Sequence, residues 1–195
     1  MNEGLGQLKS ATGRRRHGWA LSGLSRFARD PSGASALEFA LVATPLILLL
    51  LAVLEVGLVY FANFSLEAAT AKGARLIRTG QAQSQNFDAA KFKTEVCKHL
   101  SAPVTCGGLK LDVRHYSSFG GAGADLTNPI DANGNLKTNF TYDPGVGGDV
   151  VVVRAFYEWS LIAKLPKDIA LSNMANGDRM LMATVAFCNE PFKPQ

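Results

Sequence analysis

Residues 37–62 form an almost unbroken apolar run, and no other feature of the sequence restricts its folding as strongly. Between Glu38 and Lys72 the chain has no basic residue, and its only acidic residues there are Glu55 and Glu67. A helix needs about 20 apolar residues to cross the hydrocarbon layer of a bilayer. A cleavable secretory signal has an apolar core of only about 7–15 residues, so the run is too long for that class. The sequence therefore predicts one membrane-spanning helix.

The basic charge of the chain lies in front of this run. Residues 1–33 hold six basic and two acidic side chains, which account for the whole net charge of +4, and the remaining residues are balanced. By the positive-inside rule, residues 1–33 are expected in the cytoplasm and the following domain on the far side of the membrane, although Lys72, Arg75 and Arg78 reduce the asymmetry. The balanced body predicts no basic face, which argues against binding of DNA or RNA.

The predicted helix continues beyond the membrane. Residues 63–78 contain strong helix formers and no proline, and we expect one helix over residues 37–78, roughly 60 Å long at 1.5 Å per residue. Pro45 lacks a backbone donor, so a kink or local unwinding is expected just before it. Small side chains in the second part would let another helix approach closely. These are Ser65, Ala68, Ala69, Ala71, Gly73 and Ala74.

The residues after this helix predict a small antiparallel sheet. Residues 109–116 alternate between apolar and polar side chains, which is typical of a half-buried strand. Residues 149–160 and 178–189 are expected to form the other two strands. The fold class is therefore α+β, with a long N-terminal helix packed on a small antiparallel sheet.

The connecting segments are less regular. A second helix is expected over residues 87–100, capped by Asn86. Residues 117–149 are rich in Gly, Asn, Asp and Pro and predict a long loop with a turn at Asn133-Gly134. The link between the last two strands is expected to hold at most one helical turn.

The three cysteines fit an exported domain. Cys97 and Cys106 flank a loop that contains Pro and Gly, and export would make a disulfide between them the natural interpretation. Cys188 would then be buried and free or would pair with another molecule. Three reduced core cysteines are the alternative. The sequence has no CxxC or Cys/His cluster, so no metal site is predicted.

The start of the apolar run carries a specific pattern. A basic segment ends at Gly33, the small residue Ala34 follows, and Glu38 is the fifth residue after the glycine. This pattern resembles the processing site of type IV prepilins and pseudopilins. The resemblance implies cleavage after Gly33 by a prepilin peptidase, and pairing of Glu38 with the new amine of a neighbouring subunit. A carboxylate within an apolar span costs about 2.5–3.5 kcal/mol and normally has a partner. The alternative is that Gly33 is a linker residue and Glu38 lies just outside the bilayer.

A longer stretch is similar to TadE-like proteins of the tight-adherence (Tad/Flp) pilus. The similarity rests on GASALEFALVATPLILLLLAVLEVG, on the small-residue segment after it, and more loosely on VAFCNEPF near the end. It implies a pilin-like minor pseudopilin of a type IVc pilus, with Glu38 and Glu55 in subunit pairing. The implied organisation is a cleaved leader over residues 1–33, a transmembrane helix over 34–62 and a periplasmic domain over 63–195. Glu55 could also lie at the outer membrane interface.

The resemblance also implies the surroundings of the protein. Its expected partners are the prepilin peptidase, other pilins and pseudopilins, the inner-membrane assembly platform and the lipid bilayer. The expected location is the bacterial inner membrane, with one span and a cytoplasmic N-terminus. The alternative function is an uncleaved anchor with a periplasmic scaffolding domain.

Enzymatic interpretations have little support in the sequence. It contains no GxSxG, HExxH or P-loop motif, and no catalytic residue or cofactor is predicted. Asp131, Asn133 and Asn135 alternate like the start of a calcium loop, but Leu136 stands where that loop needs glycine. A plain turn is the better interpretation.

Overall fold

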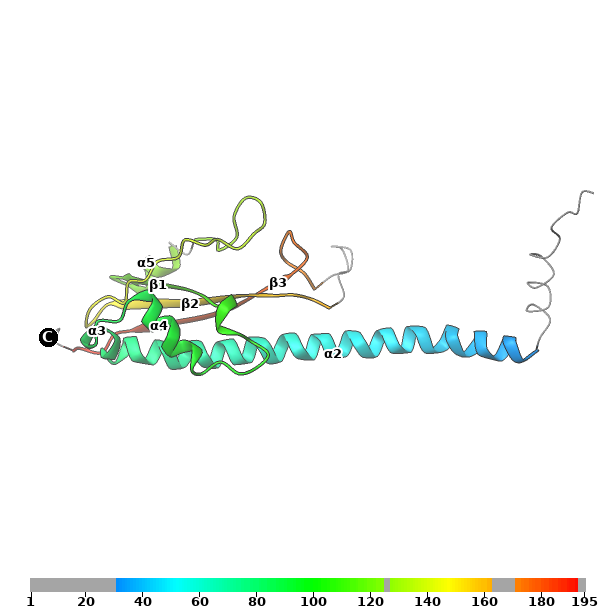
Figure 1. Cartoon of the computed structure of the whole chain (residues 1–195). Coiled ribbons are helices and arrows are strands. Elements are labelled where there is room, and N and C mark those ends of the chain that lie inside the picture. Colours follow the sequence, from blue (N-terminus) through cyan, green and yellow to red (C-terminus); the bar gives the residue numbers. More distant parts are fainter. Residues whose placement is uncertain (1–30, 125–126, 163–170, 193–195) are drawn as a thin grey trace, which may run out of the picture. The chain divides into compact units, whose positions relative to one another are not determined.

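A computed structural model of the chain describes residues 31–124, 127–162 and 171–192. It separates into two compact units, Met1–Leu51 and Ala52–Gln195. The helix α2, Pro31–Arg78, runs through the boundary between them without a break (Figure 1). It starts six residues earlier than expected, at a proline, whose fixed backbone angle suits the first position of a helix.

The unwinding expected before Pro45 does not occur. The helical conformation is continuous from Val42 through Pro45. Just before the proline, the hydroxyl of Thr44 donates a hydrogen bond to the carbonyl oxygen of Ala40 at 2.6 Å. This bond supplies a local contact where the helix loses a backbone donor.

The second unit is built on a three-stranded antiparallel sheet. The strands are β1, Lys110–Tyr116, β2, Val150–Trp159, and β3, Arg179–Cys188, with β2 in the centre. Val153 of β2 lies opposite Val113 of β1 and Val185 of β3. The strand positions agree with the sequence analysis, and the α+β fold class is confirmed.

One face of the sheet packs on the second half of α2 and forms the main core. Alternate residues of β2 point toward the helix, as the period of a strand requires. The core includes Ala62, Leu66, Ala69, Ile77, Val151, Val153, Ala155 and Tyr157. The opposite face of β2 has two smaller apolar clusters, one with Ala122 and one with Leu136 and Met174. The sheet is therefore covered on both faces.

The helix expected over residues 87–100 is shorter than predicted. It is α4, Ala89–Cys97, and its cap is Asp88, whose carboxylate accepts a hydrogen bond from the Lys91 amide at 2.7 Å. Asn86 is not the cap, because its backbone is left-handed, with a φ of 49°. The prediction of Asn86 was wrong because two residues with capping side chains lie close together here.

Among the described residues, three further short helical segments were not predicted. α3, Gln81–Ser84, follows Gly80, which has a φ of 74°. The 3-10 turn η1, Cys106–Gly108, leads into β1. α5, Phe119–Ala124, packs on β1 and β2, although its sequence is rich in glycine. The helical turn considered between β2 and β3 falls largely outside the described residues.

Candidate functional site

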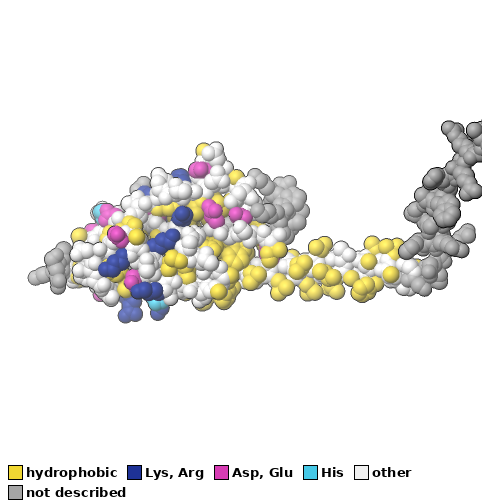
Figure 2. Space-filling view, viewed as in Figure 1, with side chains coloured by type: hydrophobic (Ala, Val, Ile, Leu, Met, Phe, Trp, Pro, Cys, Tyr) yellow, Lys and Arg dark blue, Asp and Glu magenta, His cyan; other side chains and the backbone are white. Residues whose placement is uncertain are grey.

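The first part of α2 exposes a long apolar surface. Leu46, Ile47, Leu50 and Leu54 are each more than half exposed, although they are among the most apolar residues of the chain. Figure 2 shows this surface as a hydrophobic stretch of the helix. By length and composition, α2 can cross a membrane, and it is the one helix among the described residues that can. A single membrane-spanning segment near the N-terminus accounts for such exposure.

The residues of the expected processing site lie at the start of this helix. Gly33 and Ala34 are in its first turn and are exposed, and Glu38 is exposed one turn further on. The bond between Gly33 and Ala34 is thus helical rather than extended. The first turn of a helix has amides without internal partners and frays readily, so it is the part that opens most easily.

Glu55 is in a different environment from Glu38. It is only 7% exposed, and its Oε1 accepts a hydrogen bond from the backbone amide of Ile162 at 2.6 Å. Ile162 follows the end of β2 by three residues. The carboxylate therefore joins the chain just after β2 to α2, across 107 sequence positions. The sequence analysis did not predict this contact.

The other end of the hairpin is fastened to the C-terminal end of α2. The Glu190 amide donates to the carbonyl oxygen of Arg78 at 2.9 Å, and the two side chains form an ion pair at 3.4 Å. Gly80 has no room for a side chain, because a Cβ there would lie 2.6 Å from the ring of Phe192. The segment around residues 189–192 thus closes the domain at the point where α2 ends.

Most of the small residues in the second part of α2 contact their own domain. Ser65, Ala69, Gly73 and Ala74 are buried, and a Cβ on Gly73 would overlap the Val96 side chain of α4. The sequence analysis expected these residues to let another helix approach closely, and at Gly73 the helix that does so is α4 of the same chain. Of the small residues named from the sequence, Ala68 and Ala71 are exposed.

Cys97 and Cys106 are joined by a disulfide, with their Cα atoms 5.4 Å apart. It links the end of α4 to η1, just before the first strand. Cys188 is free and exposed, so the buried position considered for it is wrong. Its sulfur lies 3.3 Å from the Gly148 carbonyl oxygen.

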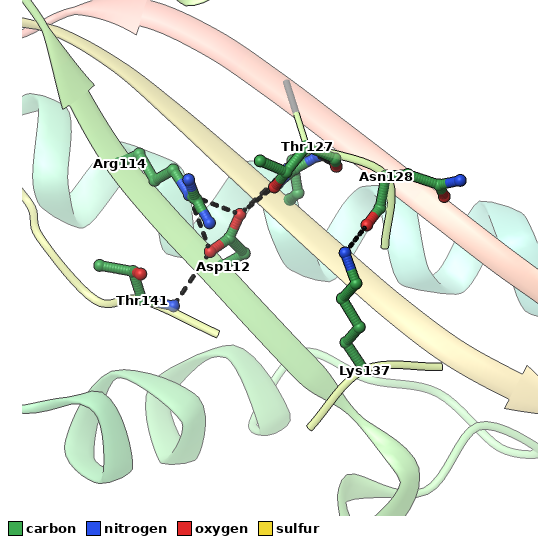
Figure 3. A network of polar contacts seen from close by, with 7 residues as sticks. Asp112, Arg114, Thr127, Asn128, Lys137 and Thr141 are labelled. Atoms are coloured by element: carbon green, nitrogen blue, oxygen red, sulfur yellow. Dashed lines mark hydrogen bonds and ion pairs between the residues drawn. The ribbon is translucent and has the colours of Figure 1, made fainter. Parts of the chain in front are cut away.

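A buried charge cluster on the outer face of the sheet was not foreseen. Asp112 is 1% exposed, and its carboxylate accepts a hydrogen bond from Arg154 Nε at 3.1 Å. It also accepts hydrogen bonds from Arg114 Nε at 3.1 Å and from the Thr141 amide at 3.0 Å (Figure 3). Arg154 Nη1 also donates to the Thr127 carbonyl oxygen at 2.8 Å. Burial alone would raise the pKa of Asp112, but the hydrogen bonds from Arg154, Thr141 and Arg114 outweigh it and hold the pKa below its usual value.

This cluster explains how the long segment before β2 is ordered. The alternation of residues 109–116 predicts a solvent-facing side for Asp112, but residues 127–141 cover that side. The sequence signal that could have shown this is Arg154, which stands between four valines and the apolar pair Ala155 and Phe156. A buried cation requires a carboxylate nearby.

The turn expected at Asn133-Gly134 is present in the structure. The Gly134 amide donates to the Asp131 carbonyl oxygen, and Gly134 has a φ of 79°. Asp131 Oδ1 accepts from the amides of Asn133 and Asn135 at 2.8 and 2.9 Å. Within the described residues, no cluster of three or more His, Cys, Asp or Glu side chains could hold a metal ion.

The comparison with protein families agrees with the resemblance seen in the sequence. Residues 33–75 match the family model described as TadE-like protein. The match begins at the glycine of the expected processing site and ends within the second half of α2. No curated protein and no solved structure matches the chain.

Proposed function

We propose that this chain, whose residues 33–75 match the TadE-like family, is a minor pseudopilin of a tight-adherence pilus that acts in pilus biogenesis. The observation that carries the proposal is the coincidence of three features in one helix. The family match starts at Gly33, the exposed apolar surface follows it, and the rest of the helix forms the core of a small α+β domain.

In this proposal a prepilin peptidase removes residues 1–33 and leaves Ala34 at the N-terminus. Both residues of the bond are exposed and lie in the first turn of α2, where opening the helix breaks few hydrogen bonds. The basic residues before Gly33 would hold the bond at the cytoplasmic face. The rest of the chain would remain in the inner membrane with its domain in the periplasm.

Glu38 is the residue best suited to pair with another subunit. Its side chain is exposed on an apolar helix, where a charge without a partner is costly. The free N-terminal amine of a neighbouring pilin or pseudopilin supplies the matching charge. Glu55 is a weaker choice, because its carboxylate is buried and binds the amide of Ile162 in the same chain.

The second candidate function is a permanent anchor with a periplasmic assembly domain. The observation that favours it is the helical conformation of the Gly33–Ala34 bond, since a protease substrate must be extended. This protein would contact the assembly platform without being cleaved.

The intact mass of the membrane-extracted protein separates the two functions. We expect loss of residues 1–33 in cells that contain a prepilin peptidase and a full-length mass in cells that lack it. The Gly33→Val variant serves as a control and should stay full-length in both strains. A full-length mass of the unaltered chain in both strains would contradict the pseudopilin function and leave the anchor.

A further inference from the structure

We infer that Ile162 and Leu171, the described residues on either side of the β2–β3 connection, form a second membrane contact of this protein together with Tyr60 of α2. This contact lies at the outer surface of the bilayer, and Glu55 holds Ile162 there. The inference depends on the proposed membrane anchoring of α2. It adds a lipid-binding surface on the folded domain and shortens the span predicted from the sequence.

The burial of α2 sets the outer boundary of the span. Val53 and Leu54 are each 63% exposed, whereas Val59 and Ala62 belong to the core of the folded domain. Lipid cannot surround a helix whose one side is packed on a sheet, so the hydrocarbon layer has to end between residues 54 and 59. Residues 34–54 span about 30 Å at 1.5 Å per residue, which matches the hydrocarbon thickness. The sequence had placed this boundary at residue 62.

Glu55 brings the hairpin to this boundary. The hydrogen bond from the Ile162 amide to the Glu55 carboxylate places the chain just after β2 beside α2. Glu55 is the first residue beyond the proposed span of residues 34–54. Trp159 of β2 pairs with Arg179 of β3, so the start of β3 is at the same end of the sheet. The described residues at this end of the sheet therefore lie near Glu55 of α2.

The side chains at this end suit a lipid interface. Ile162 is 80% exposed, Tyr60 is 73% exposed and Leu171 is 39% exposed. Tyr60 and Leu171 line a groove with Arg179 and Met182. Apolar and aromatic side chains next to an arginine are the composition found where the headgroups meet the acyl chains. In water the same exposed surface would be unfavourable.

The opposite end of the hairpin provides a matched control position. Val146 is exposed and apolar, and its carbonyl oxygen accepts a hydrogen bond from Asn189, next to the contact between Glu190 and Arg78. Arg78 lies about 35 Å further along α2 than Glu55, at 1.5 Å per residue. A bilayer that ends near Glu55 cannot reach Val146.

The test uses the full chain in vesicles of phosphatidylcholine and phosphatidylglycerol. A fluorescent label is attached to Ile162→Cys, to Val146→Cys or to Leu48→Cys, each combined with Cys188→Ser to remove the free thiol. Nitroxide lipids with the spin label near the headgroup or deep in the acyl chain then quench the label according to its depth.

We expect headgroup-level nitroxides to quench the Ile162→Cys label, with a blue-shifted emission, and to leave the Val146→Cys label unquenched. The Leu48→Cys label should be quenched best by deep nitroxides. If Leu48→Cys is quenched and Ile162→Cys behaves like Val146→Cys, the second contact does not exist. If Leu48→Cys is not quenched either, α2 does not anchor the protein in the membrane, and both the anchoring and this inference are wrong.

The role of Glu55 is tested in the same system. Glu55→Ala should lose most of the headgroup-level quenching at Ile162→Cys, whereas Glu55→Gln, which keeps an acceptor oxygen, should retain it. Glu67→Ala removes an exposed carboxylate of the same helix and should change nothing. Unchanged quenching in Glu55→Ala would show that Glu55 does not hold the hairpin at the membrane.

Discussion

Arg154 of β2 donates to the carboxylate of Asp112 on β1, and both side chains are almost completely buried on the face of the sheet away from α2. Arg154 also binds the Thr127 carbonyl oxygen, so the pair connects two strands with the segment that covers them.

Replacement of Asp112 by Asn should destabilise the domain strongly. The substitution leaves the guanidinium of Arg154 buried without its counter-ion, which costs about 3–5 kcal/mol in comparable buried pairs. Arg114→Gln is the control, since Arg114 is partly exposed and Asp112 keeps Arg154. Denaturant unfolding of the detergent-solubilised chain measures both variants, and equal losses would contradict the central role of Arg154.

The stability of the domain should fall in acid because of Asp112. Its folded-state pKa lies below the ordinary value of 3.8, so its contribution is fully present above that value and is lost as the pH falls through the folded pKa. Unfolding measured from neutral pH down to strong acid should show this loss in the unaltered chain. Asp112→Asn should show a flatter dependence below pH 3.8. Parallel curves for the two proteins would refute the assignment.

Gly73 and Gly57 of α2 should respond in opposite ways to substitution by alanine. A Cβ on Gly73 overlaps Val96 and lies 3.4 Å from Phe92, whereas a Cβ on Gly57 has no neighbour within 4 Å. Gly73→Ala should therefore destabilise by about 1–3 kcal/mol through overpacking. Gly57→Ala should be neutral or stabilise by up to about 1 kcal/mol through helix propensity. Thermal unfolding distinguishes them, and similar effects would mean that α4 does not pack this closely on α2.

Removal of the side-chain hydroxyl should affect the stability of the domain differently at Tyr142 and at Tyr157. Within the described residues, the buried hydroxyl of Tyr142 has no hydrogen-bond partner, whereas the hydroxyl of Tyr157 lies 3.3 Å from that of Thr105. Tyr142→Phe should keep or raise stability, and Tyr157→Phe should lower it by about 1 kcal/mol. Burial, and then the nearby charge of Asp88, raise the pKa of Tyr142 to about 12, so an ultraviolet titration should lose its most alkaline component in Tyr142→Phe. A loss of stability in Tyr142→Phe would reveal a partner for that hydroxyl.

Reduction of the disulfide between Cys97 and Cys106 should lower the stability of the domain. The bond closes a short loop with a sequence separation of 9, and the chain-entropy estimate for a loop of that size is about 2–3 kcal/mol. Unfolding of the Cys97→Ser/Cys106→Ser variant measures the effect. Cys188→Ser should behave like the unaltered chain, because that thiol is exposed. No difference between the double variant and the control would show that the bond does not restrict the unfolded chain.

Several elements of this protein follow from local sequence patterns. The length of the apolar run at residues 37–62 predicts a membrane-spanning helix, and the alternation at residues 109–116 predicts a strand. The fold class and the three strands agree with these patterns. A strand or a long helix can be predicted because its pattern of apolar residues lies in one continuous stretch of the chain. The consecutive residues from Gly33 onward likewise suggested the resemblance to TadE-like proteins, and residues 33–75 match that family model.

The remaining features depended on contacts between residues far apart in the chain. The alternation of residues 109–116 predicts that Asp112 faces solvent. Asp112 is buried because residues 127–141 cover that side of the strand. The small residues around Gly73 predict the close approach of another helix, but only the structure shows that this helix is α4 of the same chain. The sequence by itself determined the long apolar helix and the three strands, because each of these depends on a pattern in consecutive residues. Cleavage after Gly33 stays a prediction. Only the tertiary structure decided that Glu55 binds Ile162. The donor is a backbone amide, which almost every residue has, so the identity of residue 162 does not predict this hydrogen bond.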